Sequence, residues 1–142
     1  MKTYISLFIV VFAFLVSCNS SKEIVNNDKP KLESDTVRIA NDELEYEVLI
    51  IDSGFTNWFN SRAKPRSYYT QSYLEARNKF WVLEWNRRAN LPTIYNSSLY
   101  EMPINYETNI DYGFEVNYMI FNYLTYFQLT NKQSLGGFPA RL

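Results

Sequence analysis

The chain has 142 residues, and its 14 Lys and Arg against 15 Asp and Glu give a net charge of −1. This balance excludes a nucleic-acid partner, which requires a basic surface. The chain contains no histidine, one cysteine and four glycines. It therefore lacks a Ser-His-Asp or Cys-His arrangement, a zinc site of the usual ligand types and a Gly-rich phosphate loop. We expect no cofactor and no metal, and a binding or structural role rather than an enzyme.

The first 18 residues have the pattern of an export signal. Lys2 supplies a positive charge, residues 4–16 form an apolar run and Ser17 is small. The run is shorter than the about 20 residues that span a bilayer. Residues 15–18, Leu-Val-Ser-Cys, resemble a bacterial lipobox, in which the cysteine is acylated and the signal is cut before it. We expect residues 1–17 to be a lipoprotein signal peptide and Cys18 to carry the lipid. The alternative is an ordinary signal peptide with a chance cysteine.

Residues 18–36 are expected to form the lipidated N-terminus and a flexible linker. Residues 19–35 are polar and include only three aliphatic residues, too few to stabilise a packed structure. Asp35-Thr36-Val37 resembles the short site at which Bacteroidota attach O-glycans to exported proteins, so Thr36 is a candidate modification site. Plain linker is the alternative. Residues 37–142 are then a single small globular domain.

A strand and a short helix are predicted at the start of this domain. Residues 45–52, "EYEVLIID", alternate and then become continuously aliphatic, which is typical of a strand with a buried end. Phe55, Trp58 and Phe59 then recur at helical spacing. This spacing predicts a short helix over about residues 54–60, capped by Ser53 or Asp52.

The clearest predicted element is a helix from Tyr73 to about Ala89. Ser72 and Glu75 match a capping box, and Asn90 and Pro92 end the helix. Its apolar residues fall into two stripes, one of Tyr73, Ala76, Phe80 and Leu83 and one of Leu74, Trp81 and Trp85. We therefore expect this helix to pack between other elements, with Phe80 in the core.

Between the two stripes lie Arg77, Glu84 and Arg88. Such a strip is either a buried ion network or the floor of a groove. In a groove, the guanidinium groups and the neighbouring Trp81 and Trp85 would bind an anionic or glycan partner. We favour the network, because polar strips between packed stripes mostly serve stability.

Residues 91–111 have no helical period, and "LYEMPINYE" (99–107) is a candidate edge strand, where a proline is tolerated. The oxygen-bearing side chains of Asn105, Glu107, Asn109 and Asp111 alternate with other residues, a spacing that could suit a calcium ion. The glycine of the EF-hand calcium loop is missing, so we interpret these residues as turn and cap formers. A last helix follows Asp111. It has no charge between Glu115 and Lys132, and its apolar residues on nearly every side, with Phe121 in the middle, predict a buried helix.

The segments "YEVLIIDSGFTNWF", "YYTQSYLEARNKFWVLEWNRR", "YNSSLYEMPINYETNIDYG" and "EVNYMIFNYLTYF" resemble a group of small Bacteroidota lipoproteins classed as a domain of unknown function. The resemblance covers about residues 43–129 and implies no activity, substrate or cofactor.

The expected fold class is α+β and predominantly helical, with two long helices and one short helix packed with one or two short strands. We expect a lipoprotein of the bacterial cell envelope, anchored in the outer membrane and facing the periplasm. Its expected partners are the lipid bilayer, through acylated Cys18, and an envelope protein. The alternative is a glycan-binding or glycan-cleaving accessory protein, whose paired carboxylates would come from Glu84, Glu101, Glu107, Asp111 and Glu115.

Overall fold

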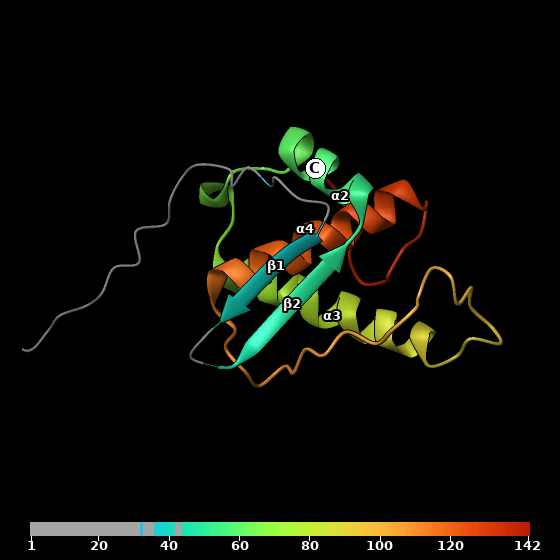
Figure 1. The fold of residues 1–142 in the computed structure, drawn as a ribbon. Coiled ribbons are helices and arrows are strands. Elements are labelled where there is room, and N and C mark those ends of the chain that lie inside the picture. The colour runs from blue at the N-terminus through green and yellow to red at the C-terminus, as the bar shows by residue number, and fades with distance from the viewer. Residues whose placement is uncertain (1–31, 33–35, 42–43) are drawn as a thin grey trace, which may run out of the picture.

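The computed structural model describes residues 32, 36–41 and 44–142. Its described elements are β1 (Thr36–Asn41), β2 (Tyr46–Ile51), α2 (Ser53–Arg62), the short 3₁₀ helix η1 (Arg66–Tyr68), α3 (Gln71–Ala89) and α4 (Gly113–Thr130). Three α-helices pack with a two-stranded antiparallel hairpin (Figure 1), which confirms the predicted α+β class. The predicted signal peptide and Cys18 lie outside the described residues.

The hairpin pairs β1 with β2 in an antiparallel register that runs from Thr36 opposite Ile51 to Asn41 opposite Tyr46. Side chains alternate between its two faces. Val37 and Ile50 are buried in the core, whereas Leu49 and Ile51 are exposed on the outer face. The predicted strand at residues 45–52 is therefore confirmed, and its partner is the segment that begins at Thr36.

The predicted edge strand at residues 99–107 is wrong, because this segment contains no strand. Side chains of α3 form hydrogen bonds with the backbone of this segment instead. The indole of Trp85 donates to the carbonyl of Met102 at 2.8 Å. The amide of Asn86 donates to the carbonyl of Ile104 and accepts from its N–H, at 2.8 and 2.7 Å. These bonds satisfy the segment as a loop, so no neighbouring strand is needed.

Helix α2 begins as predicted after Asp52. The Asp52 carboxylate accepts from the backbone N–H groups of Gly54 and Phe55 at 2.9 and 3.3 Å, which satisfies donors that the first turn leaves unpaired. Phe55 and Phe59 are fully buried. The helix therefore contributes its aromatic face to the core.

Helix α3 begins two residues earlier than predicted. Its N-cap is Thr70, whose hydroxyl accepts from the N–H of Tyr73 at 3.3 Å, so the capping box assigned to Ser72 is wrong. The stripe that contains Leu74, Trp81 and Trp85 is buried. The other stripe faces solvent, with Phe80 52% and Leu83 70% exposed. The prediction that both sides of α3 are packed is therefore wrong.

Helix α4 is the central element, and α2, α3 and β1 all pack against it (Figure 1). Phe121 and its neighbours are buried, as predicted. The buried amides of Asn117, Asn122 and Gln128 each donate to the carbonyl four residues earlier in the helix, at 2.8, 2.7 and 3.1 Å. Polar side chains can therefore lie inside the core without losing their hydrogen bonds.

Candidate functional site

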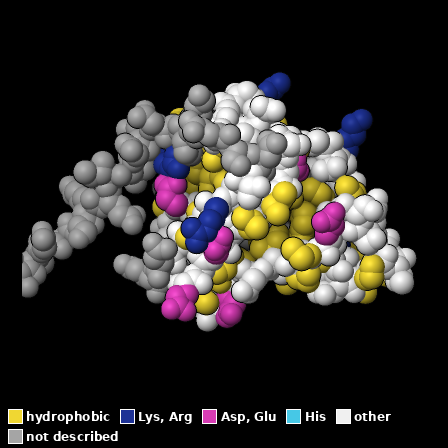
Figure 2. Space-filling view, viewed as in Figure 1, with side chains coloured by type: hydrophobic (Ala, Val, Ile, Leu, Met, Phe, Trp, Pro, Cys, Tyr) yellow, Lys and Arg dark blue, Asp and Glu magenta, His cyan; other side chains and the backbone are white. Residues whose placement is uncertain are grey.

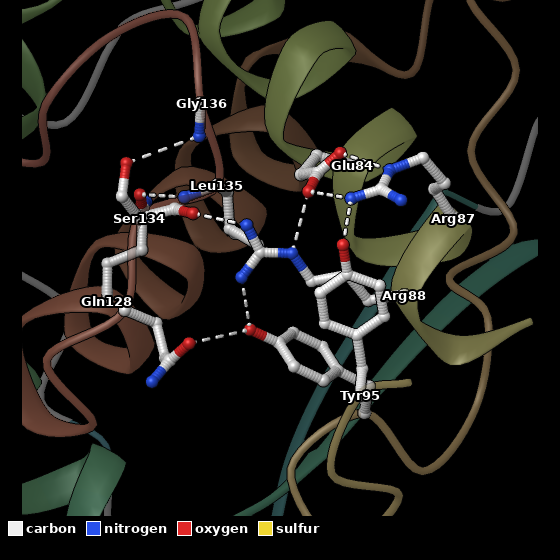
Figure 3. A network of polar contacts seen from close by, with 10 residues as sticks. Glu84, Arg87, Arg88, Tyr95, Gln128, Ser134, Leu135 and Gly136 are labelled. Carbon is white, nitrogen blue, oxygen red and sulfur yellow. Dashed lines mark hydrogen bonds and ion pairs between the residues drawn. The ribbon is translucent and has the colours of Figure 1, made fainter. Parts of the chain in front are cut away.

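Glu84 is the centre of a network of charged side chains near the C-terminal end of α3 (Figure 3). The Arg88 Nε atom donates to Glu84 Oε1 at 2.7 Å. Arg87 donates through Nε to Glu84 Oε2 and through Nη2 to Oε1, both at 2.7 Å. Because the three residues are three and four positions apart on one helix, the helix itself brings them together.

Arg88 ties this helix to two distant parts of the chain. Its Nη1 atom donates to the hydroxyl of Tyr100 at 2.7 Å, in the loop that follows α3. Its Nη2 atom donates to the carbonyl of Ser134 at 2.6 Å, beyond α4. A planar guanidinium presents several donors in a fixed geometry. The residue thus joins α3, the loop that follows it and the segment that follows α4.

The arginines set the ionisation of Glu84. Hydrogen bonds from Arg87, together with those from Arg88, outweigh partial burial and lower the pKa of Glu84 from 4.5 to about 2. Burial opposes the charge on Arg88, but its bonds to Glu84 and Tyr100 raise its pKa overall. Glu84 is therefore ionised, and Arg88 charged, at any physiological pH.

Arg77 does not join this network, although the sequence placed it in the same strip. Its guanidinium carbon lies 3.5 Å from the ring centre of Phe138 and 4.9 Å from that of Tyr73. Its Nη1 atom is buried and has no hydrogen-bond partner among the described residues. The predicted strip is thus divided into a stacked arginine and a separate ion network.

Trp81 and Trp85, which the sequence placed beside the strip, are buried side chains of the core. Trp81 stacks on Phe121 with ring centres 5.4 Å apart, and its indole donates to the carbonyl of Phe138 at 3.2 Å. Trp85 packs edge-on against Phe127 at 4.7 Å. Their ring faces are therefore occupied by core residues and are not available to a partner beside the network.

Sequence reasoning missed Arg87 and Tyr95. Arg87 lies on the exposed side of α3, and its Nη2 atom donates to the hydroxyl of Tyr95 at 2.6 Å. The available signal was its spacing of three residues from Glu84. Tyr95 gave no such signal, because it lies in a loop without a helical period.

Among the carboxylates considered for sugar chemistry, Glu84, Glu115 and Asp111 are bound by other side chains, and Glu107 is exposed. Glu115 is paired with Arg66 through two short bonds of 2.6 and 2.5 Å. Asp111 accepts from the amide of Gln71 at 2.6 Å. Glu101 is exposed and lies near Tyr123: burial first, then the charges of Asp52 and Glu101, raise the pKa of Tyr123 to about 12. Asp52, the other carboxylate that acts on Tyr123, caps helix α2 and accepts a hydrogen bond from the Tyr126 hydroxyl at 3.1 Å.

Three further observations concern the described part of the chain. Among residues 32, 36–41 and 44–142 there is no group of three or more His, Cys, Asp or Glu side chains able to hold a metal ion. None of the helices described in this part has the length and apolar character that crossing a membrane requires. Thr36, the candidate glycosylation site, is the exposed first residue of β1.

Apolar side chains gather on the face that carries the hairpin, as Figure 2 shows beside β2. On the outer face of the sheet Leu49 is 53% exposed and Ile51 is 74% exposed. The register places both side chains on the side of the hairpin opposite to buried Ile50. Clustered exposed side chains of this size are typical of an interaction surface.

The chain was compared with known proteins at the level of family, sequence and structure. Residues 6–139 match a family described as a family of unknown function (DUF6146). No curated protein and no solved structure is similar enough to the chain to match it.

Proposed function

The chain belongs to this family of unknown function, and we propose that it is a lipid-anchored protein of the bacterial envelope whose folded domain is an interaction module. The proposed anchor is acylated Cys18, and the proposed location is the outer membrane on its periplasmic side. The lipobox pattern at residues 15–18 supports the anchor. Three acyl chains on this residue, two on its side chain and one on its amino group, would exceed the two membrane anchors needed for stable attachment.

The observation that carries the interaction role is the exposed apolar face of the hairpin. Leu49 and Ile51 point away from the core on a sheet that has only two strands among the described residues. Fully burying a side chain of this kind contributes about 1.5–3 kcal/mol. Leu49 and Ile51 are 53% and 74% exposed, so a protein partner that covers this face would gain the corresponding part of that stabilisation from each residue. The partner we propose is therefore an envelope protein with an apolar contact surface.

The anchor is tested by the Cys18→Ala variant. We expect it to lose labelling by radioactive fatty acid and to leave the membrane fraction. The measurement is fractionation of envelopes after a high-salt wash, with the wild-type protein alongside. A variant that stays in the washed membrane fraction would show that the lipid is not the anchor.

The interaction face is tested by purifying the acylated protein from its own envelope with its partners. Ile51→Lys places a charge in the apolar face and should abolish recovery of the co-purifying protein. Ile94→Lys is the matched control, because Ile94 is similarly exposed but lies in the loop after α3. Equal recovery with both variants would remove the hairpin face from consideration, whereas loss with Ile51→Lys alone supports it.

A further inference from the structure

The solvent-facing side of α3 carries a second apolar surface, which is separate from the hairpin face. Phe80 and Leu83 project from it, and Tyr73 is exposed in its first turn. Tyr68, just before the helix, extends this surface at its N-terminal end, and partly buried Phe138 lies beside its middle, against Phe80 and Arg77. We refer to these five residues as the apolar ridge. From Tyr73 to Leu83 alone the helix rises about 15 Å.

The rings of the ridge form two groups, and the Arg77 side chain lies between them. Tyr69 stacks with Tyr73 at 5.5 Å and packs edge-on against Tyr68 at 5.0 Å. Phe138 packs edge-on against Phe80 at 5.4 Å. Arg77 fills the space between Tyr73 and Phe138 with its guanidinium group. Such a surface offers two groups of rings to a partner, with one arginine between them.

The charges beside the ridge are positive. The Lys64 ammonium lies 5.8 Å from the ring centre of Tyr68, and Lys79 is exposed one position before Phe80. Neither lysine, nor Arg77, forms an ion pair with another described residue. The carboxylate of Glu84, on the same side of α3, is neutralised by Arg87 and Arg88. The whole chain has a net charge of −1, so this face is positive against the overall balance.

The positive charge beside the ridge favours an anionic lipid surface over a second copy of the chain as its partner. In a symmetric dimer the same patch would face itself, and the cations of one copy would meet those of the other. An anionic lipid surface is complementary to the ridge in both respects. Rings of Tyr and Phe settle at the headgroup level, and lysines reach the phosphates while their methylene groups stay apolar.

The length of the chain before β1 allows this contact. Leu32 is bonded to Asn60 of α2 through its N–H and its carbonyl, both at 3.0 Å, so the free length ends there. The 13 residues between Cys18 and Leu32 span at most about 45 Å when extended. A domain of about 100 residues has a radius of gyration of only about 13 Å. A lipid at Cys18 would therefore let any face of the domain reach the bilayer. Which face lies against it depends on surface chemistry.

We propose that the apolar ridge rests on the membrane surface, with Lys64 and Lys79 on anionic phosphates, and leaves the hairpin face free for the protein partner. The inference relies on the lipid anchor of the proposed function and adds an orientation to it. The ligand is the interfacial layer of an anionic bilayer.

The test measures the depth of single positions in vesicles. Full-length acylated protein is reconstituted into vesicles of phosphatidylethanolamine and phosphatidylglycerol that contain a nitroxide-labelled lipid. Acylation leaves the chain without a free thiol, so a fluorophore reacts only at Leu83→Cys or, as matched control, at Ile51→Cys. Both positions are largely exposed. We expect quenching at position 83 to be at least threefold stronger than at position 51.

Charge variants sharpen the test. Adding Lys79→Glu to Leu83→Cys should reduce the quenching at least twofold, whereas Arg38→Glu, an equal change of charge on the outer face of the hairpin, should not. Equal quenching at positions 83 and 51, or none at 83, would overturn the proposal. So would disulfide-linked dimers formed through Leu83→Cys, which would place a second copy on the ridge. If the protein does not float with the vesicles, the lipid anchor fails and the ridge proposal fails with it.

Discussion

At the scale of single residues, the two arginines that hold Glu84 have unequal weight. The side chain of Arg88 is 13% exposed and that of Arg87 is 47% exposed. An ion pair in water contributes little, because solvent screens it and the side chains lose freedom. Arg88 is shielded and also bonds Tyr100 and Ser134. Its contact with Glu84 therefore dominates the stability of the network.

The sequence could reveal only the local half of this network. A spacing of four residues on a helix identified the pair of Glu84 and Arg88. The bonds from Arg88 to Tyr100 and Ser134 join residues 12 and 46 positions away. Such contacts depend on how a loop and the C-terminal segment fold back, and no periodicity encodes that. The same limit hid the stacking of Arg77 on Phe138.

Removing the charge of Glu84 tests this account. Glu84→Gln should lower the free energy of unfolding by about 1–3 kcal/mol. The variant weakens a partly buried, charged hydrogen bond between Glu84 and Arg88, whereas the bonds of Arg88 to Tyr100 and Ser134 remain. The measurement is urea denaturation at pH 7. Glu47→Gln is the control, since Glu47 pairs with Arg38 on the exposed hairpin and should leave the denaturation midpoint nearly unchanged.

The pH dependence of the same variant follows from the depressed pKa. The pKa of Glu84 is 4.5 normally and about 2 in the folded chain. The contribution of its charge is therefore fully present above about pH 5 and is lost as the pH falls towards 2. The difference in stability between wild type and Glu84→Gln should shrink between pH 5 and pH 2. A difference that stays constant over this range would contradict the assigned role of the charge.

At the scale of elements, α3 shows what a helical pattern can and cannot specify. The wheel sorted its apolar residues correctly into two faces. It did not show that only one face meets α4, because both faces carry rings of similar size. The position of the first turn was decided by Thr70 rather than Ser72, since either hydroxyl can cap. The existence and type of the elements could be predicted, but not which face is covered.

The two faces of α3 and the core of α4 predict different costs of truncation. Phe121 is buried against Trp81 and Tyr69, so Phe121→Ala should cost about 3–5 kcal/mol. Phe80 keeps half of its surface in solvent, so Phe80→Ala should cost less than about 1.5 kcal/mol. Chemical denaturation of both variants measures the difference. Equal costs would mean that Phe80 is covered in solution.

At the scale of the whole molecule, the core is held together by aromatic side chains. Trp81, Phe121, Phe55, Phe59 and Tyr118 are nearly or fully buried, and α4 brings rings from α2, α3 and the loops into contact. Aromatic residues make up 18% of the chain, a share that favours such a core. The contacts between rings depend on the packing of α4 against three other elements, which composition does not specify.

This core predicts an unusual dependence of stability on pH. Burial first, and neighbouring charges next, raise the pKa values of Tyr46, Tyr69, Tyr123 and Tyr126 from 10 to about 12. A raised pKa in the folded state means that the stabilisation is complete below pH 10 and is lost as the pH rises towards 12. The chain has no histidine. We therefore expect stability to be nearly constant from pH 6 to pH 9 and to fall steeply above pH 10.

The Tyr123→Phe variant isolates one of these groups, because the Tyr123 hydroxyl makes no hydrogen bond with another described residue, although Asp52 and Glu101 act on it. Between pH 8 and pH 11 the variant should lose about 1 kcal/mol less stability than the wild type. In the wild type the Tyr123 phenol ionises more readily in the unfolded state, which favours unfolding at high pH, and the variant lacks this phenol. Urea denaturation at the two pH values gives this difference. Tyr68→Phe is the matched control, because it removes the same hydroxyl from a side chain that is 65% exposed. If Tyr123→Phe also loses as much as the wild type, alkaline unfolding does not depend on this buried ring, and the cause must lie with the other tyrosines around α4.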